Sequence, residues 1–222
     1  MSHHHEHAQE ALDGVAFWEN HYGQSERVWS GKVNQVLENI VAPLDPGTCL
    51  DIGSGEGGDV LWLASHGWKA TGLDISPTAV KRAQEEAAKH GLDAGQTRFI
   101  ASDLAAWNTD ETFDLVTLSF FQAPFAFPRA DFLRKATTLV APGGHLLALS
   151  HAAMPSFADK PDHQMPAFPT PEEELEALAL DPEQWDVLCA EVRERTITGP
   201  DGNPATLEDA VVFVQRKAPS LG

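Results

Sequence analysis

The chain has 222 residues, of which 42% are hydrophobic, and this size and composition fit a single α/β domain with a sizeable core. Its formal net charge of −18 at pH 7 repels phosphate backbones and anionic lipids, which argues against nucleic-acid and membrane partners. A small neutral or cationic partner fits this charge, as does a surface that is acidic only for solubility.

We expect a cytoplasmic protein, because no apolar run is long enough to span a bilayer and no signal peptide is evident. The two cysteines, Cys49 and Cys189, give no disulfide framework and fit the same compartment. Residues 1–14 precede any apolar periodicity and are expected to form a disordered tail. The histidines at positions 3, 4, 5 and 7 have no companion ligands at metal-binding spacing, so no metal site is predicted.

Apolar periodicity and turn residues predict an alternation of helices and strands that is typical of a parallel sheet. In the first half we expect helices at Val15–Tyr22, Lys32–Ile40, Gly58–His66 and from the Ser76-Pro77 cap to Gly91, and strands at Thr48–Ile52, Lys69–Asp74 and Thr97–Ala101. In the second half we expect strands at Phe113–Ser119 and His145–Ser150, a helix at Arg129–Leu139, an acidic helix from Glu172 to Leu180 that continues through Trp185 to Cys189, and antiparallel strands at Glu191–Thr198 and Ala210–Lys217.

A glycine-rich loop follows the first predicted strand. Glycines 53, 55, 57 and 58 allow a ligand to lie directly against backbone amides. Asp51 stands just before this loop, and Asp74 follows at the end of the second strand. Because a carboxylate at that strand end can accept both hydroxyls of a ribose, the pattern predicts a nucleoside site.

Further motifs follow in order, namely Asp103 after the third strand, Phe113-Asp114-Leu115-Val116, and Pro142-Gly143-Gly144. Together with the glycine loop they resemble class I S-adenosylmethionine-dependent methyltransferases, from about Phe17 to the C-terminus. The stretch Phe17–Tyr22, with Trp29 and Asn34, resembles the lid of the small-molecule branch that includes tellurite-resistance and thiopurine methyltransferases.

The resemblance implies a Rossmann-like three-layer α/β sandwich with a mostly parallel seven-stranded sheet, an antiparallel last strand and an N-terminal helical lid. It implies one domain over 15–222, with a lid at 15–40, a cofactor-binding half at 41–150 and an acceptor-side half at 151–222. The implied reaction is the transfer of a methyl group from S-adenosylmethionine to a small molecule by in-line displacement.

The resemblance also implies roles for individual residues. Gly53, Ser54 and Gly55 would lie against the methionine part of the cofactor, with Asp51 supporting the loop and the amino group. Asp74 would take the ribose hydroxyls, and Ile75, Asp103 and Leu104 would contact the adenine. The backbone carbonyl of Ser119 would accept from the methionine ammonium, and Trp29 would cover the site. Asp51 and Asp103 could instead be simple loop caps.

The acceptor site is expected beyond the C-terminal ends of the strands, where the Trp29 segment, the loop Phe120–Pro128 and the segment after His151 would converge. Aromatic faces at Trp29, Phe120 and Phe121 would attract a sulfonium or a cationic acceptor, although ordinary packing explains them equally well. His151, and less directly His21 and His163, are candidate bases, although a single histidine is more often structural.

Two alternatives stay open. An NAD(P)-dependent oxidoreductase would use the same glycine loop and Asp74, but Tyr22 is the only tyrosine, so no Tyr-x-x-x-Lys pair follows the loop. A non-catalytic S-adenosylmethionine-binding protein fits the same motifs. The sequence allows a monomer or a homodimer.

Overall fold

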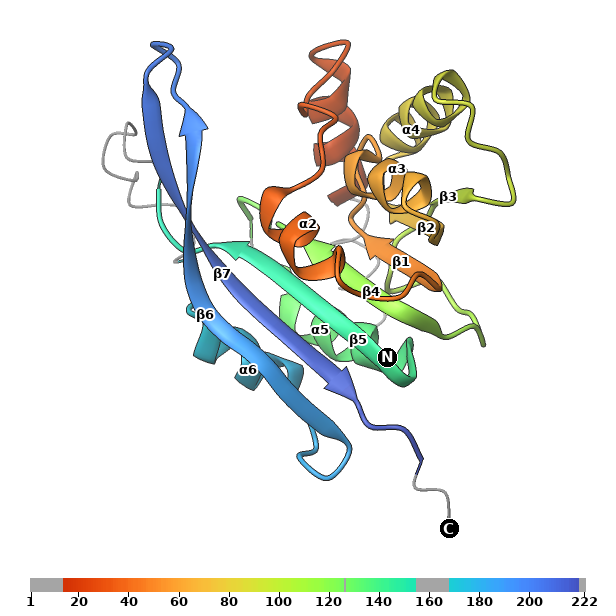
Figure 1. Cartoon of the computed structure of the whole chain (residues 1–222). Helices are drawn as coiled ribbons and strands as arrows, with labels where there is room; N and C mark the ends of the chain where they lie inside the picture. Colours follow the sequence, from red (N-terminus) through yellow and green to blue (C-terminus); the bar gives the residue numbers. More distant parts are fainter. Residues whose placement is uncertain (1–13, 126, 155–167, 220–222) are drawn as a thin grey trace, which may run out of the picture. The chain divides into compact units, whose positions relative to one another are not determined.

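Figure 1 shows the chain as a computed structural model, in which residues 14–125, 127–154 and 168–219 are described. The predicted tail over residues 1–14, apart from Gly14, and the candidate base His163 therefore lie outside the described residues. The chain divides into two compact units, Met1–Glu111 and Thr112–Gly222. The expected division of a single domain into a lid and two halves stays a prediction.

The first unit contains a three-stranded parallel sheet. Strands β1 (Thr48–Ile52), β2 (Lys69–Asp74) and β3 (Thr97–Ala101) lie in the order β3-β2-β1 and have the predicted bounds. Helices α3 (Gly58–Ser65) and α4 (Pro77–Lys89) pack against β2 and β3. Residues 14–23 and α2 (Gln35–Val41) are helical ahead of β1, although α2 begins three residues later than the expected Lys32, because Asn34 caps it.

Local sequence signals explain where the helices of this unit begin and end. The Ser76 hydroxyl accepts a hydrogen bond from the Ala79 amide at 3.1 Å, and Pro77 occupies the first turn of α4. Gly67 and Gly91 follow α3 and α4 with φ of +92° and +72°, a conformation that favours glycine. The buried stripe on α4 consists of Ala79, Val80, Ala83 and Ala87. The predicted cap and stripe are confirmed.

The second unit contains a mixed sheet in the order β4-β5-β7-β6. Its strands are β4 (Phe113–Ser119), β5 (Val140–His151), β6 (Trp185–Thr198) and β7 (Pro204–Arg216). β4 and β5 are parallel, whereas β7 runs antiparallel to both β5 and β6. β6 and β7 form the long hairpin drawn in blue in Figure 1, and helices α5 (Arg129–Thr138) and α6 (Pro171–Leu178) complete the unit.

The predicted continuation of the acidic helix through Trp185 to Cys189 is wrong. Helix α6 ends at Leu178 with Ala179 in the left-handed conformation, at φ +50°. Asp181 then forms a turn, because its carboxylate accepts from the Glu183 amide at 2.9 Å and its carbonyl accepts from the Trp185 amide at 3.0 Å. Residues from Trp185 onward pair with β7, so Cys189 lies in a strand and the hairpin is longer than expected.

Candidate functional site

The glycine loop connects β1 to α3 in a conformation that few other residues could adopt. Gly53, Gly55 and Gly57 have φ of +74°, +53° and +84°. The amides of Gly53 and Ser54 donate to the Leu73 carbonyl at 2.8 and 3.1 Å, which fixes the start of the loop against β2. Positive φ is open to glycine at little cost, so the loop depends on these residues for its shape.

Asp74 is the central charged group of this loop. It lies at the end of β2 with 7% of its surface exposed. Its carboxylate accepts from the Gly55 amide at 2.7 Å and from the Ser76 amide at 2.8 Å. Burial raises the pKa of Asp74, against the opposing effect of these backbone hydrogen bonds. Asp74, the residue predicted to bind the ribose, therefore contacts the glycine loop directly.

The other predicted cofactor residues of the first unit lie in β1, after β3 and before α4. Asp51 is buried within β1, at 2% exposure, next to the start of the loop. Asp103 caps a turn after β3, since one carboxylate oxygen accepts from the Ala105 amide at 2.8 Å, and Leu104 is buried beside it. Ile75 stands between Asp74 and the cap of α4. Asp103 therefore caps a turn, as the alternative allowed, and its predicted contact with the adenine stays a prediction.

Residues 14–31, which we call the lid segment after the lid predicted at 15–40, lie against the glycine loop. The indole nitrogen of Trp29 donates to the Tyr22 hydroxyl at 3.0 Å. A Cβ atom placed on Gly55 would lie 3.0 Å from that hydroxyl and 3.3 Å from the Trp29 ring. Burial and the negative charge of Asp74 raise the pKa of Tyr22 well above its usual range, so the phenol stays protonated. Trp29 and Tyr22 therefore lie beside the glycine loop, and the predicted cofactor contact of Trp29 stays a prediction.

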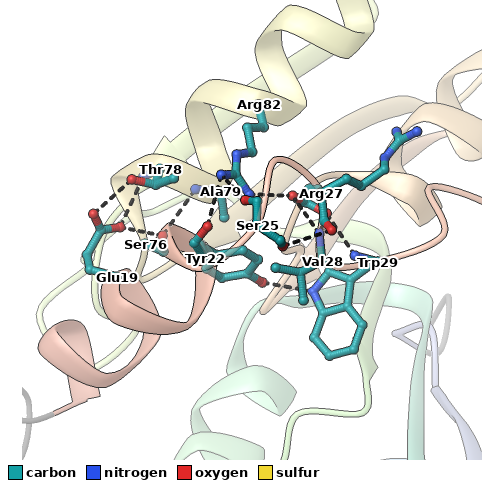
Figure 2. A network of polar contacts seen from close by, with 11 residues as sticks. Glu19, Tyr22, Ser25, Arg27, Val28, Trp29, Ser76, Thr78, Ala79 and Arg82 are labelled. Atoms are coloured by element: carbon teal, nitrogen blue, oxygen red, sulfur yellow. Dashed lines mark hydrogen bonds and ion pairs between the residues drawn. The ribbon is translucent and has the colours of Figure 1, made fainter.

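Two charged side chains that the sequence interpretation missed fasten the lid segment. Glu56 is 4% exposed and accepts from the amides of Val28 and Trp29 at 3.0 and 2.9 Å. Arg82 of α4 donates to Glu56 at 2.8 Å and to the carbonyls of Tyr22 and Ser25 at 2.9 and 2.7 Å. Figure 2 shows Arg82 reaching from α4 to this backbone. One ion pair thus holds both ends of the Tyr22–Trp29 stretch.

A third acid, Glu19, connects the lid segment to the beginning of α4. Its carboxylate accepts from the hydroxyl of Ser76 and, at 2.9 Å, from the hydroxyl of Thr78 (Figure 2). These hydrogen bonds lower the pKa of Glu19, and the one from Ser76 has the largest effect. The carboxylate is therefore ionised at neutral pH. Because Ser76 also binds Asp74 through its amide, the lid segment and the Asp74 carboxylate share a neighbour.

Removing the Glu56 carboxylate should release the lid segment. In Glu56→Ala the amides of Val28 and Trp29 lose their acceptor, and we expect their hydrogen exchange to accelerate by about tenfold or more, since one such bond contributes about 1.5–3 kcal/mol. The matched control is Glu38→Ala, which removes an exposed acid from α2 of the same unit. Equal hydrogen-exchange rates at the amides of Val28 and Trp29 in the wild type, Glu56→Ala and Glu38→Ala would contradict the fastening role of Glu56.

The remaining predicted residues belong to the second unit. Ser119 ends β4, and its hydroxyl is buried without a hydrogen-bond partner among the described residues. Phe121 packs edge-to-face on Phe127 and Phe132, with ring centroids 5.7 Å apart in both pairs. Phe120 instead stacks on His151 at 4.3 Å. Packing therefore accounts for Phe121, whereas Phe120 is the aromatic neighbour of the candidate base.

The residues of the first unit fit a nucleoside ligand. The Ser54 hydroxyl is buried and has no hydrogen-bond partner among the described residues. The backbone around it is free of side chains at Gly53, Gly55 and Gly57, and the buried Asp74 carboxylate lies at the same loop. A hydroxylated ligand would supply partners for these groups. Within the described ranges, no helix is long and apolar enough to cross a membrane, and no cluster of three or more His, Cys, Asp or Glu side chains could hold a metal.

Comparison with known proteins relates this chain to methyltransferases. Residues 49–144, from β1 to the first part of β5, match the methyltransferase domain family. A probable thiol methyltransferase 2 from Arabidopsis thaliana is 32% identical over 136 residues, and the alignment covers 60% of this chain and 60% of that protein. The chain therefore spans less than two thirds of that relative's length.

Solved structures show the same fold. A structure describing the conversion of a disulfide bond into a thioacetal group during echinomycin biosynthesis is 24% identical, with a TM-score of 0.68 over 93% of this chain and 94% of that one. The N-methyltransferase NodS from Bradyrhizobium japonicum, in complex with S-adenosyl-L-homocysteine, is 19% identical, with a TM-score of 0.58 over 82% of this chain and 84% of that one.

These likenesses confirm the predicted fold class, a Rossmann-like three-layer α/β sandwich with a mostly parallel seven-stranded sheet and an antiparallel last strand. The matched family covers the glycine loop, Asp74 and Asp103, which are the residues on which the predicted nucleoside site depends. Residues 49–144 thus match the methyltransferase domain family, and the predicted resemblance to class I S-adenosylmethionine-dependent methyltransferases is confirmed.

Proposed function

We propose that this chain transfers a methyl group from S-adenosylmethionine to a small-molecule acceptor. The observation that carries the proposal is the buried Asp74 carboxylate, bonded to the Gly55 amide at the end of β2. This arrangement offers a glycine backbone without side chains and a buried carboxylate to one nucleoside. The match to the methyltransferase domain over residues 49–144 supports the same ligand.

The residues that would hold S-adenosylmethionine are Trp29, Asp51, Gly53, Ser54, Gly55, Asp74, Ile75, Asp103, Leu104 and Ser119. When bound, this cofactor supplies a methyl group on a positively charged sulfur. The chain's own part is then to hold the acceptor at near-attack distance and to exclude water. The lid segment, fastened by Glu56 and Arg82 beside the glycine loop, serves the exclusion of water.

We infer that the acceptor is a small molecule such as a thiol, which is the acceptor class in the name of the Arabidopsis thaliana relative. We expect the loop Phe120–Pro128 and His151 to line a mostly apolar acceptor site. Of this loop, Ala126 lies outside the described residues. A cofactor-bound structure with both Phe121 and His151 more than about 10 Å from the methyl carbon would contradict this assignment.

The net charge and the two free cysteines support a class of acceptor and a cellular compartment for this activity. With a net charge of −18 the chain suits small acceptors better than nucleic acids or membranes. Cys49 and Cys189 are both free, which fits the cytoplasm. We propose that the protein works there as a monomer or a homodimer.

Methyl transfer can be tested with a panel of small thiols. The whole chain is incubated with S-adenosylmethionine and each thiol, and mass spectrometry then looks for the methyl thioether and S-adenosylhomocysteine in equal amounts. Formation of both is expected. Binding of S-adenosylmethionine without turnover of any acceptor would favour a non-catalytic binding protein, and binding of NADH instead would favour an oxidoreductase.

A further inference from the structure

A histidine, an aspartate and an arginine come together on one face of the second unit's sheet. His151 is the last residue of β5 and lies directly opposite Asp209 of β7. Asp209 in turn lies opposite Arg193 of β6, so Arg195, two residues further on, is its diagonal neighbour on the same face. Strand register therefore brings together three side chains that are far apart in sequence.

The contacts within this cluster leave one facing pair of polar atoms without partners. Asp209 is completely buried, and one of its carboxylate oxygens accepts from Nε of Arg195 at 2.5 Å. The other oxygen, Oδ1, lies 3.6 Å from Nδ1 of His151. Both of these atoms are buried, and neither has a hydrogen-bond partner among the described residues. A proton on Nδ1 that is donated to Asp209 would satisfy both atoms, since buried polar groups are rarely left unpaired.

Phe120 packs against the face of the imidazole. Its ring stacks on His151 at 4.3 Å, and the Arg195 guanidinium lies over the same ring, 5.5 Å from the centroid. Phe120 has φ of +55°, a conformation that is strained for a bulky residue and persists where the surroundings hold it. Strain of this kind is typical of functional sites.

The position of the cluster is that of a ligand site. His151 ends β5 and Phe120 directly follows β4, and ligands of open α/β sheets sit beyond the C-terminal ends of such strands. The His151 side chain is 38% exposed, whereas Asp209 is not exposed at all. A ligand can therefore reach the imidazole but not the carboxylate behind it.

We propose that Asp209 is a positioning residue that holds the His151 imidazole with Nδ1 protonated, so that Nε2 serves as the base that deprotonates the methyl acceptor. This inference rests on the proposed methyl transfer. The proton of the acceptor's X–H bond passes to Nε2, and the electron pair of that bond stays on X and forms the new bond to the methyl carbon. The electron pair of the broken carbon–sulfur bond remains on the donor sulfur.

The charged groups around His151 are consistent with this role. Asp209 faces the imidazole from β7, and Arg195, from β6, is paired with Asp209. The loop after β4 contributes no charge, since Phe120 stacks on the ring and the Gln122 side chain accepts from the His151 amide at 2.9 Å. A base is useful only for an acceptor that carries a dissociable proton. The cluster therefore favours thiols and acidic hydroxyl groups over sulfides and tertiary amines.

The tautomer of His151 tests the positioning role without any turnover. Nitrogen NMR of the whole chain, labelled with 15N at histidine and assigned with His151→Gln, reports which ring nitrogen carries the proton in the neutral form. The Nδ1-protonated tautomer is expected in the wild type and in Glu208→Gln, which removes an exposed acid next to Asp209 on β7. In Asp209→Asn the Nε2-protonated form should appear. An Nε2-protonated imidazole in the wild type would overturn the proposal, whether or not Asp209→Asn folds.

Two thiol acceptors of different acidity test whether His151 acts as a general base. Benzyl mercaptan is largely un-ionised at neutral pH, whereas 4-nitrothiophenol is already ionised. With benzyl mercaptan, Asp209→Asn should lose at least about tenfold in kcat, since a general base contributes about 10²–10⁴. With 4-nitrothiophenol it should stay within about threefold of the wild type, because no proton has to be removed. Equal losses with both thiols would overturn the base. Turnover of neither thiol by the wild type would count against the proposed function, and the tautomer alone would then decide the role of Asp209.

Discussion

Replacing Asp74 with alanine is expected to weaken the binding of S-adenosylmethionine by at least about 100-fold. The carboxylate would accept two ribose hydroxyls, and each charge-assisted hydrogen bond contributes about 1.5–3 kcal/mol, where 1.4 kcal/mol corresponds to a factor of ten. Asp74 also holds the Gly55 and Ser76 amides, so its loss alters the shape of the loop as well. Titration calorimetry of the two proteins measures the difference.

The mutant should still fold. Loss of Asp74 leaves two backbone amides without their acceptor, at a cost of about 1–3 kcal/mol each, but it also removes a carboxylate whose pKa is raised by burial. These effects oppose each other in the free energy of unfolding. Asp93→Ala is the matched control, because the exposed Asp93 also accepts from a backbone amide, that of Gly95 at 2.7 Å, away from the loop. Equal affinity in wild type, Asp74→Ala and Asp93→Ala would show that Asp74 does not bind the ribose.

Gly57→Ala should lower the free energy of unfolding by about 2–5 kcal/mol. Gly57 has φ of +84°, which costs an alanine about 1–2 kcal/mol. A Cβ there would also lie 2.9 Å from Cβ of Ala83 on α4 and 3.1 Å from the Phe99 ring, and overpacking typically costs a further 1–3 kcal/mol or so. Urea unfolding measures the sum of both effects.

Gly91→Ala separates these two costs. Gly91 has φ of +72°, but a Cβ there would meet nothing within 4 Å, so only the backbone cost of about 1–2 kcal/mol is expected. The difference between the two mutants then reports the close packing of the glycine loop against α4. If Gly57→Ala and Gly91→Ala lost the same stability, that packing would be refuted.

The parts of the fold that depend on local sequence were predictable. The bounds of β1, β2, β3 and β4 follow from apolar runs, and the start of α4 follows from the Ser76-Pro77 cap. The error at Trp185–Cys189 has a local cause too, since the turn at Asp181 and Pro182 separates α6 from a strand whose partner, β7, follows later in the chain. Helix and strand patterns cannot be told apart in a short segment without that partner.

The candidate site was predictable where a motif defines it and not where long-range contacts do. The glycine loop and Asp74 form a sequence motif, and the structure brings them together. Glu56 and Arg82 are separated by 26 positions and meet only because α4 packs beside the loop. Asp209 reaches His151 only through the register of β5 and β7. The sequence did contain one signal for Glu56. It is a charged residue within a loop of four glycines, a position that suggests a specific partner for its carboxylate.

Titration calorimetry of the whole chain with S-adenosylhomocysteine, and separately with NADH, tests most directly whether the glycine loop and Asp74 form a methyltransferase cofactor site. One-to-one binding of S-adenosylhomocysteine is expected, with affinity lost in Asp74→Ala and kept in Asp93→Ala, and with no heat from NADH. Binding of NADH in the absence of any binding of S-adenosylhomocysteine would contradict the cofactor assignment.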